Sequence, residues 1–204
     1  MAIMACYCID IAAQQAWLGG HLTAADQQQA QRYTHPPRQQ QFLAARALLR
    51  WLVSEFVTTE LPLEIRKYPS GAPYLLLGEQ LLSCSIAHTD NAVLVGLSDG
   101  QQPFGLDIER VDAARWQTSP VVAKYQHGMM HNVGSSSLAR AQRWNLAEAV
   151  VKAEQGKLLE VLQRQSEPLL AHASLAQVGG YSYAIYHPQC DTDAVSVIPA
   201  PTIG

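Results

Sequence analysis

The sequence predicts an α+β protein made of two packed halves. Apolar residues make up 48% of the 204 residues, enough for a sizeable core and too many for a disordered chain. Segments with strand-like alternation surround two long segments with helical spacing. Their order is strand, helices, strands, then helix and strands. This order favours two α+β halves, at residues 1–105 and 106–204.

The first half is expected to begin with a strand at residues 3–9, where side chains alternate as in a half-buried strand. Thr23 can cap a helix that runs to about Tyr33. Pro36 then opens a longer helix to about residue 58, because proline is tolerated in the first turn. Apolar residues recur along this segment at helical spacing, so one of its faces should be buried.

The rest of the chain is expected to be rich in strands around one more long helix. The pattern predicts a turn at 68–73, then strands at 81–87, 92–98 and 102–109, with a hairpin-type turn at 98–100. A loop at 126–137 leads to a helix at 138–155, which Gly156 is placed to end. Short strands are expected at 158–163, 169–175, 181–187 and 194–197.

Charged residues are scarce, at 15% of the chain against about 25% in ordinary soluble domains. The 14 basic and 17 acidic residues give a net charge of −3, so we expect no general binding to nucleic acid. No apolar run approaches the ~20 residues of a membrane-spanning helix. The apolar start has no basic residue before it, so a signal peptide is not expected.

The four cysteines stand at positions 6, 8, 84 and 190, and none forms a C-x-x-C pair. This spacing predicts neither a zinc site nor a disulfide framework. We therefore expect reduced, mostly buried thiols in a cytoplasmic protein.

Two carboxylates stand close together on the strand predicted at 102–109. Asp107 and Glu109 project from one face of that strand, while Leu106 and Ile108 face the core. Neighbouring carboxylates repel each other unless a positive charge lies between them. The pair therefore indicates either a solvated strand end or a site for a hard divalent cation, above all Mg²⁺.

Glu148 and Lys152 share a face of the late helix because they are four residues apart. An exposed pair at this spacing stabilises a helix by only ~0.3–0.5 kcal/mol. Trp144 lies one turn earlier on the same stripe, which favours the wall of a site over an ordinary surface pair. Glu148 can then complete a three-carboxylate metal site with Asp107 and Glu109, and Lys152 can lie beside a developing negative charge.

Positive charge is concentrated in residues 27–54, which contain no acidic residue. Arg46 lies near the edge of the apolar face of the predicted helix, where an unpaired cation is costly, and Arg50 follows one turn later. The partner of Arg46 is either a carboxylate of the same chain, in an internal salt bridge, or the phosphate of a ligand. Arg32 and Arg38 add to the same positive segment.

Three segments resemble, in order and spacing, the surfactin-type 4′-phosphopantetheinyl transferases, also called type II holo-acyl-carrier-protein synthases. Residues 83–88 (SCSIAH) resemble the N-I-S-H element of that family. Residues 104–109 (FGLDIE) resemble its G-I/V-D-I/V-E element, and residues 144–152 (WNLAEAVVK) its W-S/T-x-K-E-A-x-x-K element. The segment 45–49 resembles the upstream arginine-bearing helix, and 68–73 resembles the R/G-x-G-K-P turn.

The resemblance implies a pseudo-dimer of two similar α+β halves with the active site in the cleft between them. It implies transfer of the phosphopantetheine arm of coenzyme A to a serine of an apo acyl or peptidyl carrier protein, with release of 3′,5′-ADP. Such an enzyme would be a cytoplasmic monomer that serves fatty acid, polyketide or nonribosomal peptide biosynthesis. Neither nucleic acid nor a membrane is an expected partner.

The resemblance also implies roles for the candidate site residues. Asp107, Glu109 and Glu148 would hold Mg²⁺ on the diphosphate of coenzyme A. Glu148 would also be the base for the incoming serine, directly or through water. Lys152 would stabilise the diphosphate and the leaving charge. The remaining expected coenzyme A ligands are Arg46 and His88, on the 3′-phosphate, and Arg50.

The chain departs from the family pattern at three of these elements. Ala72 replaces the lysine of the turn, Ala87 the serine before the histidine, and Ala147 the lysine before the late glutamate. Each lost charged hydrogen bond weakens binding by ~1.5–3 kcal/mol. A second hypothesis is therefore a weak or inactive relative that binds a carrier protein or a nucleotide like coenzyme A. A third is a metal-dependent phosphohydrolase that uses the same carboxylates.

The segment 126–137 does not show the aromatic F-F-S-x-x-E element that the family carries after its metal motif. His127 and His131 have the spacing H-x-x-x-H, but they lack the glutamate of H-E-x-x-H and enclose a glycine. We interpret this segment as a flexible loop with two exposed histidines.

Overall fold

The computed structural model describes residues 2–57, 61–98, 103–189 and 194–201. The chain divides into two compact units, Met1–Gln101 with Val195–Gly204, and Gln102–Ala194. The predicted division near residue 105 lies close to the observed one. The C-terminal segment differs from prediction, because it returns to the first unit, where it pairs with the opening strand.

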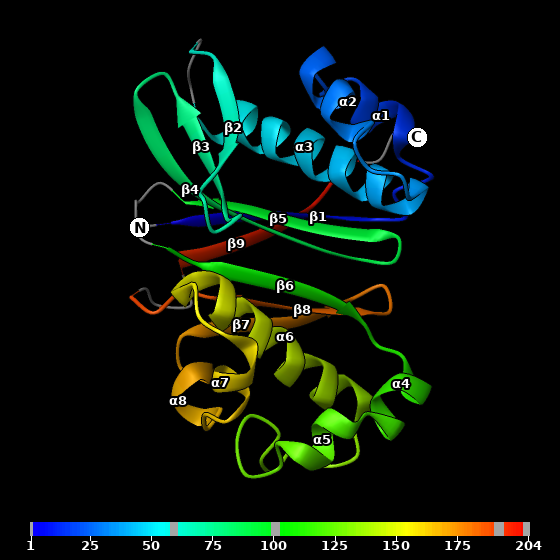
Figure 1. The fold of residues 1–204 in the computed structure, drawn as a ribbon, viewed down its shortest axis with the longest axis vertical. Helices are drawn as coiled ribbons and strands as arrows, with labels where there is room; N and C mark the ends of the chain where they lie inside the picture. Colours follow the sequence, from blue (N-terminus) through cyan, green and yellow to red (C-terminus); the bar gives the residue numbers. More distant parts are fainter. Residues whose placement is uncertain (1, 58–60, 99–102, 190–193, 202–204) are drawn as a thin grey trace. The chain divides into compact units, whose positions relative to one another are not determined.

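The first unit contains a six-stranded sheet with the strand order β2-β3-β4-β5-β1-β9 (Figure 1). All neighbours are antiparallel except β1 and β9, which are parallel with Ile3 opposite Val195. The strands are β1 (Ile3–Ile9), β2 (Leu63–Lys67), β3 (Pro73–Leu77), β4 (Gln80–Thr89), β5 (Ala92–Ser98) and β9 (Val195–Pro199).

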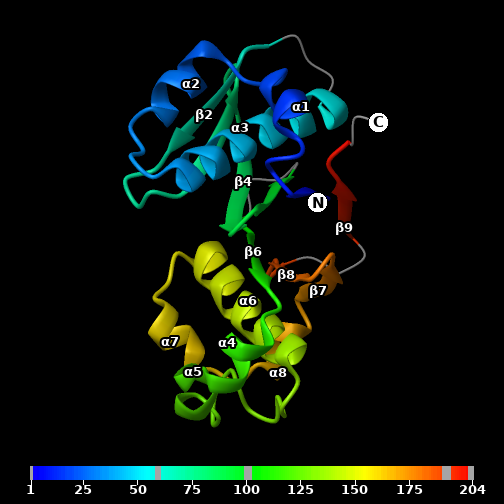
Figure 2. The same ribbon diagram turned by 90° about the vertical axis from the view of Figure 1, so that its right-hand side faces the viewer.

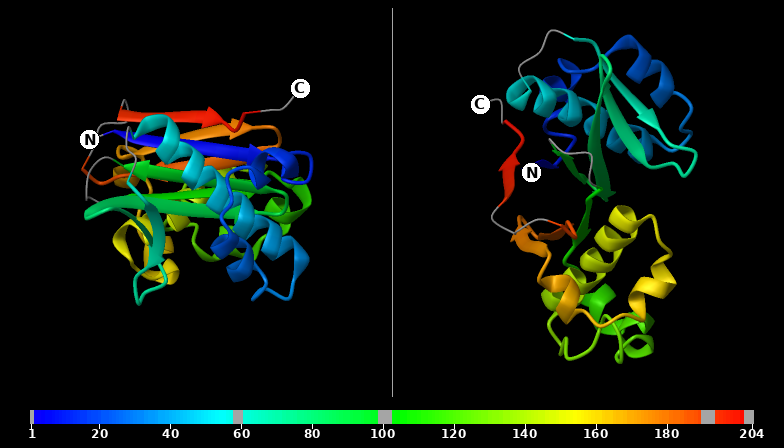
Figure 3. Two further views of the ribbon diagram at one scale, coloured as in Figure 1. Left: turned by 90° about the horizontal axis from the view of Figure 1, so that it is seen from above. Right: turned by 90° about the vertical axis from the view of Figure 1, so that its left-hand side faces the viewer.

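Three helices accompany this sheet: α1 (Gln15–Gly19), α2 (Ala24–Ala30) and α3 (Pro36–Phe56). The predicted cap of Thr23 is confirmed as a capping box, in which its Oγ1 accepts from the Asp26 amide at 3.2 Å and Asp26 Oδ2 accepts from the Thr23 amide at 3.1 Å. Helix α3 lies along the sheet (Figure 3) and packs against β1 and β5. Its buried leucines form the core with strand residues such as Val93 and Val95.

The second unit contains a three-stranded antiparallel sheet with the order β6-β8-β7. Helix α6 (Ser137–Glu154) packs against β6 (Gly105–Arg110) and β8 (Tyr181–Tyr186). The remaining elements, gathered around α6 in Figure 2, are α4 (Ala113–Thr118), α5 (Pro120–Lys124), α7 (Leu158–Leu162), α8 (Glu167–Leu170) and β7 (Ala173–Val178). The predicted mixture of helices and strands is confirmed in both units.

Several local predictions are wrong. The strand predicted at 158–163 is helix α7, and the strand predicted at 169–175 begins as the end of helix α8. Short apolar runs of this kind fit a buried helix turn as well as a strand, so periodicity cannot separate the two. Helix α6 agrees with its prediction to within one residue at each end, but its left-handed C-cap is Gln155, with φ of 52°, and not a glycine. The hairpin turn predicted at 98–100 lies mostly outside the described residues.

Other elements were absent from the prediction or ended elsewhere. Helices α4 and α5 precede the predicted loop, and strands β2 and β3 flank the predicted turn at 68–73. Helix α2 ends at Ala30, before Tyr33. These elements are short, and short elements carry too few residues for a clear period.

Among the described residues no helix is long and apolar enough to cross a membrane. Cys6, Cys8 and Cys84 are buried free thiols, as predicted, while Cys190 lies outside the described residues. Burial raises the pKa of Cys8 and of Cys84 to about 12, so both thiols stay protonated and unreactive at neutral pH.

Candidate functional site

An ion pair between β6 and α6 is the centre of the candidate site. Lys152 Nζ lies 2.8 Å from Asp107 Oδ1 and also donates to the Leu106 carbonyl at 2.9 Å. Gly105 permits this contact, because a Cβ on it would lie 1.8 Å from the Ala149 carbonyl oxygen. The absence of a side chain therefore lets strand and helix approach closely enough to pair.

The Asp107 carboxylate is almost enclosed, with 10% of its side chain exposed. Burial raises its pKa to about 7, and Lys152 counteracts this while the negative charges of Glu148 and Glu109 add to it. Its second oxygen, Oδ2, is buried and has no hydrogen-bond partner among the described residues. A buried acceptor without a partner is costly, so this atom is suited to receive a cation or a proton.

Glu148 lies one turn before Lys152 on α6, as the spacing predicts. Burial raises the pKa of Glu148, Lys152 lowers it, and the charge of Glu109 raises it further. The predicted aromatic neighbour Trp144 packs near Trp116 of α4, with ring centroids 6.3 Å apart. Glu148 is thus a half-buried carboxylate whose environment favours proton uptake, as a general base requires.

Glu109 is engaged differently from the other two carboxylates. Both its oxygens accept from the guanidinium of Arg115, at 2.7 and 3.2 Å. In the described parts of the chain, no three His, Cys, Asp or Glu side chains gather in a way that could hold a metal ion. The structure therefore brings Asp107, Glu148 and Lys152 into one electrostatic cluster, and it pairs Glu109 with Arg115.

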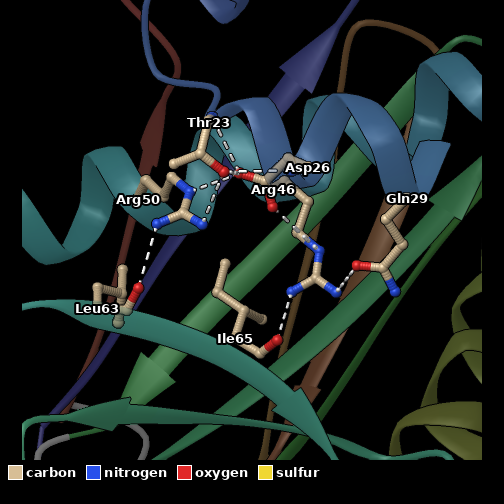
Figure 4. Close-up of polar contacts among 7 residues, drawn as sticks. All are labelled: Thr23, Asp26, Gln29, Arg46, Arg50, Leu63 and Ile65. Atoms are coloured by element: carbon tan, nitrogen blue, oxygen red, sulfur yellow. Dashed lines mark hydrogen bonds and ion pairs between the residues drawn. The ribbon is translucent and has the colours of Figure 1, made fainter.

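Two arginines of α3, Arg46 and Arg50, belong to a polar network around Asp26 in the first unit (Figure 4). Arg50 Nε lies 2.8 Å from Asp26 Oδ2, and its Nη1 donates to the Leu63 carbonyl at 3.3 Å. Burial opposes ionisation of Asp26, but hydrogen bonds from Arg50 and Thr23 outweigh it, so the pKa of Asp26 lies below its ordinary value. Arg50, which was expected to bind coenzyme A, thus forms an internal salt bridge with Asp26.

Arg46 is more deeply buried, with 4% of its side chain exposed. It donates to the Ile65 carbonyl at 3.1 Å and to Gln29 Oε1 at 3.3 Å, and its Nε lies 3.9 Å from Asp26 (Figure 4). Burial lowers its pKa, while Asp26 partly compensates. Arg46 and Arg50 therefore share the single carboxylate of Asp26, which can neutralise only one of the two guanidinium charges.

Arg46 also lines a cavity of about 170 Å³ in the first unit. Among the described residues no carboxylate lines it, and four of the lining side chains are basic or imidazole groups: Arg38, Arg46, Lys67 and His88. His88 contacts Arg38 through its Nε2. The cavity wall also includes the rings of Tyr33 and Phe42, which lie 5.2 Å apart between centroids. This lining suits a phosphate next to an apolar or planar group.

Two of these basic residues were not among the predicted site residues. Arg38 belongs to the positive segment noted in the sequence, but nothing local distinguishes it from Arg32. Lys67 pairs in register with Pro73 across the turn that contains Ala72. Its place in the cavity depends on the hairpin of β2 and β3, which the sequence did not predict.

Comparison with known proteins adds no assignment to this geometry. A scan against known protein families finds no match, and a search of curated proteins finds no significant match.

Proposed function

We propose that this protein is a cytoplasmic 4′-phosphopantetheinyl transferase, which moves the phosphopantetheine arm of coenzyme A to a serine of an apo carrier protein. The observation that carries the proposal is the Asp107–Lys152 pair, whose free carboxylate oxygen is buried beside Glu148. Phosphoryl-type transfer depends mostly on positioning and charge stabilisation, and this cluster supplies both.

The residues of the cluster are compatible with Mg²⁺. This ion prefers oxygen ligands and is usually bound by one or two carboxylates together with waters and substrate phosphates. Asp107 Oδ2 is a buried acceptor that no described residue hydrogen-bonds, and Glu148 provides a second carboxylate. These two would hold the ion, which neutralises charge on the diphosphate when bound. Glu109 would contribute only after giving up part of its contact with Arg115.

In this proposal Glu148 accepts the proton of the carrier serine, directly or through water. The serine oxygen forms a bond to the phosphorus that bears the pantetheine arm, and the bond from that phosphorus to the 3′,5′-ADP oxygen breaks. Lys152 stabilises the negative charge on the leaving diphosphate oxygen. Asp107 keeps the Lys152 ammonium in place through the 2.8 Å ion pair.

We assign the 3′-phosphate of coenzyme A to the basic cavity of the first unit. Arg46 and His88 are the expected ligands, and Arg38 and Lys67 line the same cavity. Lys67 can supply the positive charge that is missing from the turn, where Ala72 replaces the lysine of the family pattern. Arg50 does not line the cavity and is paired with Asp26, so its role in this proposal is to hold Asp26 and thereby Arg46.

The finer fold that we propose is the pseudo-dimer typical of such transferases. Each unit has one long helix packed on antiparallel strands, α3 on β1 and β5 and α6 on β6 and β8. The sheets have six and three strands, so any similarity is limited to this core.

The test is incubation of the protein with coenzyme A, Mg²⁺ and a panel of apo acyl and peptidyl carrier proteins, followed by intact-mass spectrometry. We expect one carrier to gain the mass of a phosphopantetheine group, with release of 3′,5′-ADP. Glu148→Gln should slow the transfer by at least about 100-fold, the usual contribution of a general base. Glu160→Gln, in the exposed Glu160–Lys157 pair of the same unit, is the matched control and should be fully active.

Absence of modification across a broad panel would refute the transferase. A second candidate function, a related protein that binds a carrier or nucleotide without transfer, is favoured by the double hydrogen bond of Arg115 to Glu109. It predicts calorimetric binding of coenzyme A or a carrier without turnover, and unchanged binding in Glu148→Gln.

A further inference from the structure

We infer that the second unit carries another ligand site, for a small phosphate monoester, in a cavity near the start of α6. The cavity has a volume of about 530 Å³ and is lined by the α4–α5 region, the turn at 126–134, and Arg140. Small-molecule sites commonly have volumes of about 300–1,000 Å³. More than three helical turns, about 18 Å, separate Arg140 from Lys152 along α6, so this cavity is distinct from the Asp107–Lys152 cluster.

Arg140 is the fixed positive charge of this cavity. Its Nε donates to the Gly134 carbonyl at 3.0 Å and its Nη1 to the Trp116 carbonyl at 2.8 Å. Neither its Nη2 nor its charge has a partner among the described residues: no hydrogen bond involves Nη2, and no described carboxylate forms an ion pair with Arg140. A guanidinium held on one edge by carbonyls presents its remaining donors in a geometry that matches phosphate oxygens.

The rest of the lining also favours an anion. His127 and His131 line the cavity together with polar groups such as Ser119 and Asn132, and no aspartate or glutamate of the described part of the chain lines it. Glu167 approaches His131 at 4.0 Å from outside this lining. A metal cation on the two imidazoles would be repelled by the nearby guanidinium, whereas an anion is attracted by it.

The turn that carries both histidines is held in place by α7 and its neighbours. Gly128 lies so close to the end of α7 that a Cβ on it would be 2.5 Å from the Leu162 carbonyl oxygen. The same carbonyl accepts from the Met129 amide at 3.0 Å, and Gln165 Nε2 donates to the His127 carbonyl at 2.6 Å. The histidines therefore flank a buried anchor, and a site with such preorganised groups loses less entropy when it binds.

The chemistry of the lining selects the class of ligand. A phosphate monoester presents several terminal oxygens to the guanidinium, the imidazoles and the polar side chains. Val122, Met130 and Val133 add apolar surface for the organic group of the ester. The H-x-x-x-H pattern, which the proposed transferase does not use, thus has a function in this second site.

The probe for this site is phenyl phosphate, titrated into the full-length protein and followed by calorimetry and by amide chemical shifts. We expect saturable binding, with shifts at residues 126–134 and at Arg140. Arg140→Gln should weaken the affinity at least about tenfold, since it removes a charged hydrogen bond. Because Arg140 also joins two carbonyls, His127→Gln is the second variant and should weaken binding while folding normally. His172→Gln, an exposed histidine outside the cavity, is its matched control.

Three results would overturn the inference. The first is the absence of saturable binding, and the second is binding that is unchanged in the His127 and Arg140 variants. The third is binding whose chemical shifts centre on Arg46 and His88, because the ligand would then occupy the first-unit cavity. Glu148→Gln should bind phenyl phosphate as the unmodified protein does, so failure of the transferase proposal would leave this test unaffected.

Discussion

The ionisation of Asp107 illustrates how one side chain links stability to the candidate chemistry. Its carboxylate is buried between Lys152, which favours the charged form, and Glu148 and Glu109, which oppose it. Burial is the largest influence, so the pKa rises to about 7. A carboxylate of this kind is neutral or ionised at physiological pH depending on which cation lies beside it.

The pH dependence of stability follows from this shift. In the unfolded chain an aspartate ionises near pH ~3.9, whereas Asp107 in the folded protein ionises near 7. Between these values the unfolded state has lost a proton that the folded state keeps, so rising pH favours unfolding. As the pH rises from about 4 to 7, we expect the ionisation of Asp107 to lower the free energy of unfolding by a few kcal/mol. Above about pH 7 this contribution no longer changes.

Asp107→Asn tests this contribution. The measurement is urea unfolding from pH 4 to 8 without divalent ions. As the pH rises to 7, the free energy of unfolding of the unmodified protein should fall relative to that of the variant. Glu160→Gln, in an exposed ion pair, should give a curve parallel to that of the unmodified protein. If the curve for Asp107→Asn were also parallel to that of the unmodified protein, the raised pKa of Asp107 would be contradicted.

Asp26 is the buried carboxylate of the first unit on which stability depends, because it forms ion pairs with two arginines. Asp26→Ala should destabilise the protein by about 3–5 kcal/mol, since removing one member of a buried ion pair leaves uncompensated charge at Arg46 and Arg50. Chemical denaturation measures this loss. Glu64→Ala, which removes the exposed partner of Arg66, should have little effect. A similarly small loss for Asp26→Ala would contradict the network.

At the scale of secondary-structure elements, the close approach of β6 and α6 decides whether the candidate site forms. The sequence predicts both elements and the faces that carry Asp107, Glu148 and Lys152, because those depend on local periodicity. It also identifies Gly105 as part of a motif. The separation between strand and helix depends on the missing Cβ of Gly105, whose close neighbour is the backbone of Ala149.

Gly105→Ala should therefore weaken both folding and transfer. Its methyl group would overlap the Ala149 carbonyl, and overpacking of this kind costs about 1–3 kcal/mol or more. Moving β6 away from α6 would also lengthen the Asp107–Lys152 contact, so transfer should fall further than stability alone explains. Thermal unfolding and the carrier assay measure the two effects.

The control for that substitution is Gly156→Ala, just after α6. A Cβ at Gly156 has open space around it, so this variant should be as stable and active as the unmodified protein. Equal behaviour of Gly105→Ala and Gly156→Ala would show that close packing of β6 on α6 is unimportant.

At the scale of the whole molecule, the chain ends in the unit where it began. Strand β9 pairs with β1 in parallel, the Ala200 amide donates to the Tyr7 carbonyl at 2.8 Å, and Ala200 belongs to the first core. The sequence predicts a short strand at 194–197 but places it in the second half. A short strand contains no local signal for which sheet it will join, because its partner is chosen by long-range contacts.

Removal of residues 195–204 tests this organisation. The β1 edge would lose its parallel neighbour, so amides of β1 should exchange with solvent faster, while amides of β6, β8 and α6 keep their protection. Hydrogen exchange followed by mass spectrometry resolves the two units. Faster exchange in β6 and β8 with unchanged β1 would contradict the observed sheet order.

The sequence by itself determined the chemistry-bearing faces: two carboxylates on one side of β6, Glu148 and Lys152 on one side of α6, and an arginine-rich helix. These follow from periods of two and 3.6 residues, which act within a few positions of the chain. Only the tertiary structure decided the partners. It joined Lys152 to Asp107, 45 positions away, and assigned Arg50 to Asp26 and Glu109 to Arg115. It also placed Lys67 and His88 in the wall of one cavity. Such pairings depend on the path of the chain and on the cost of burying an unpaired charge, which local spacing does not encode.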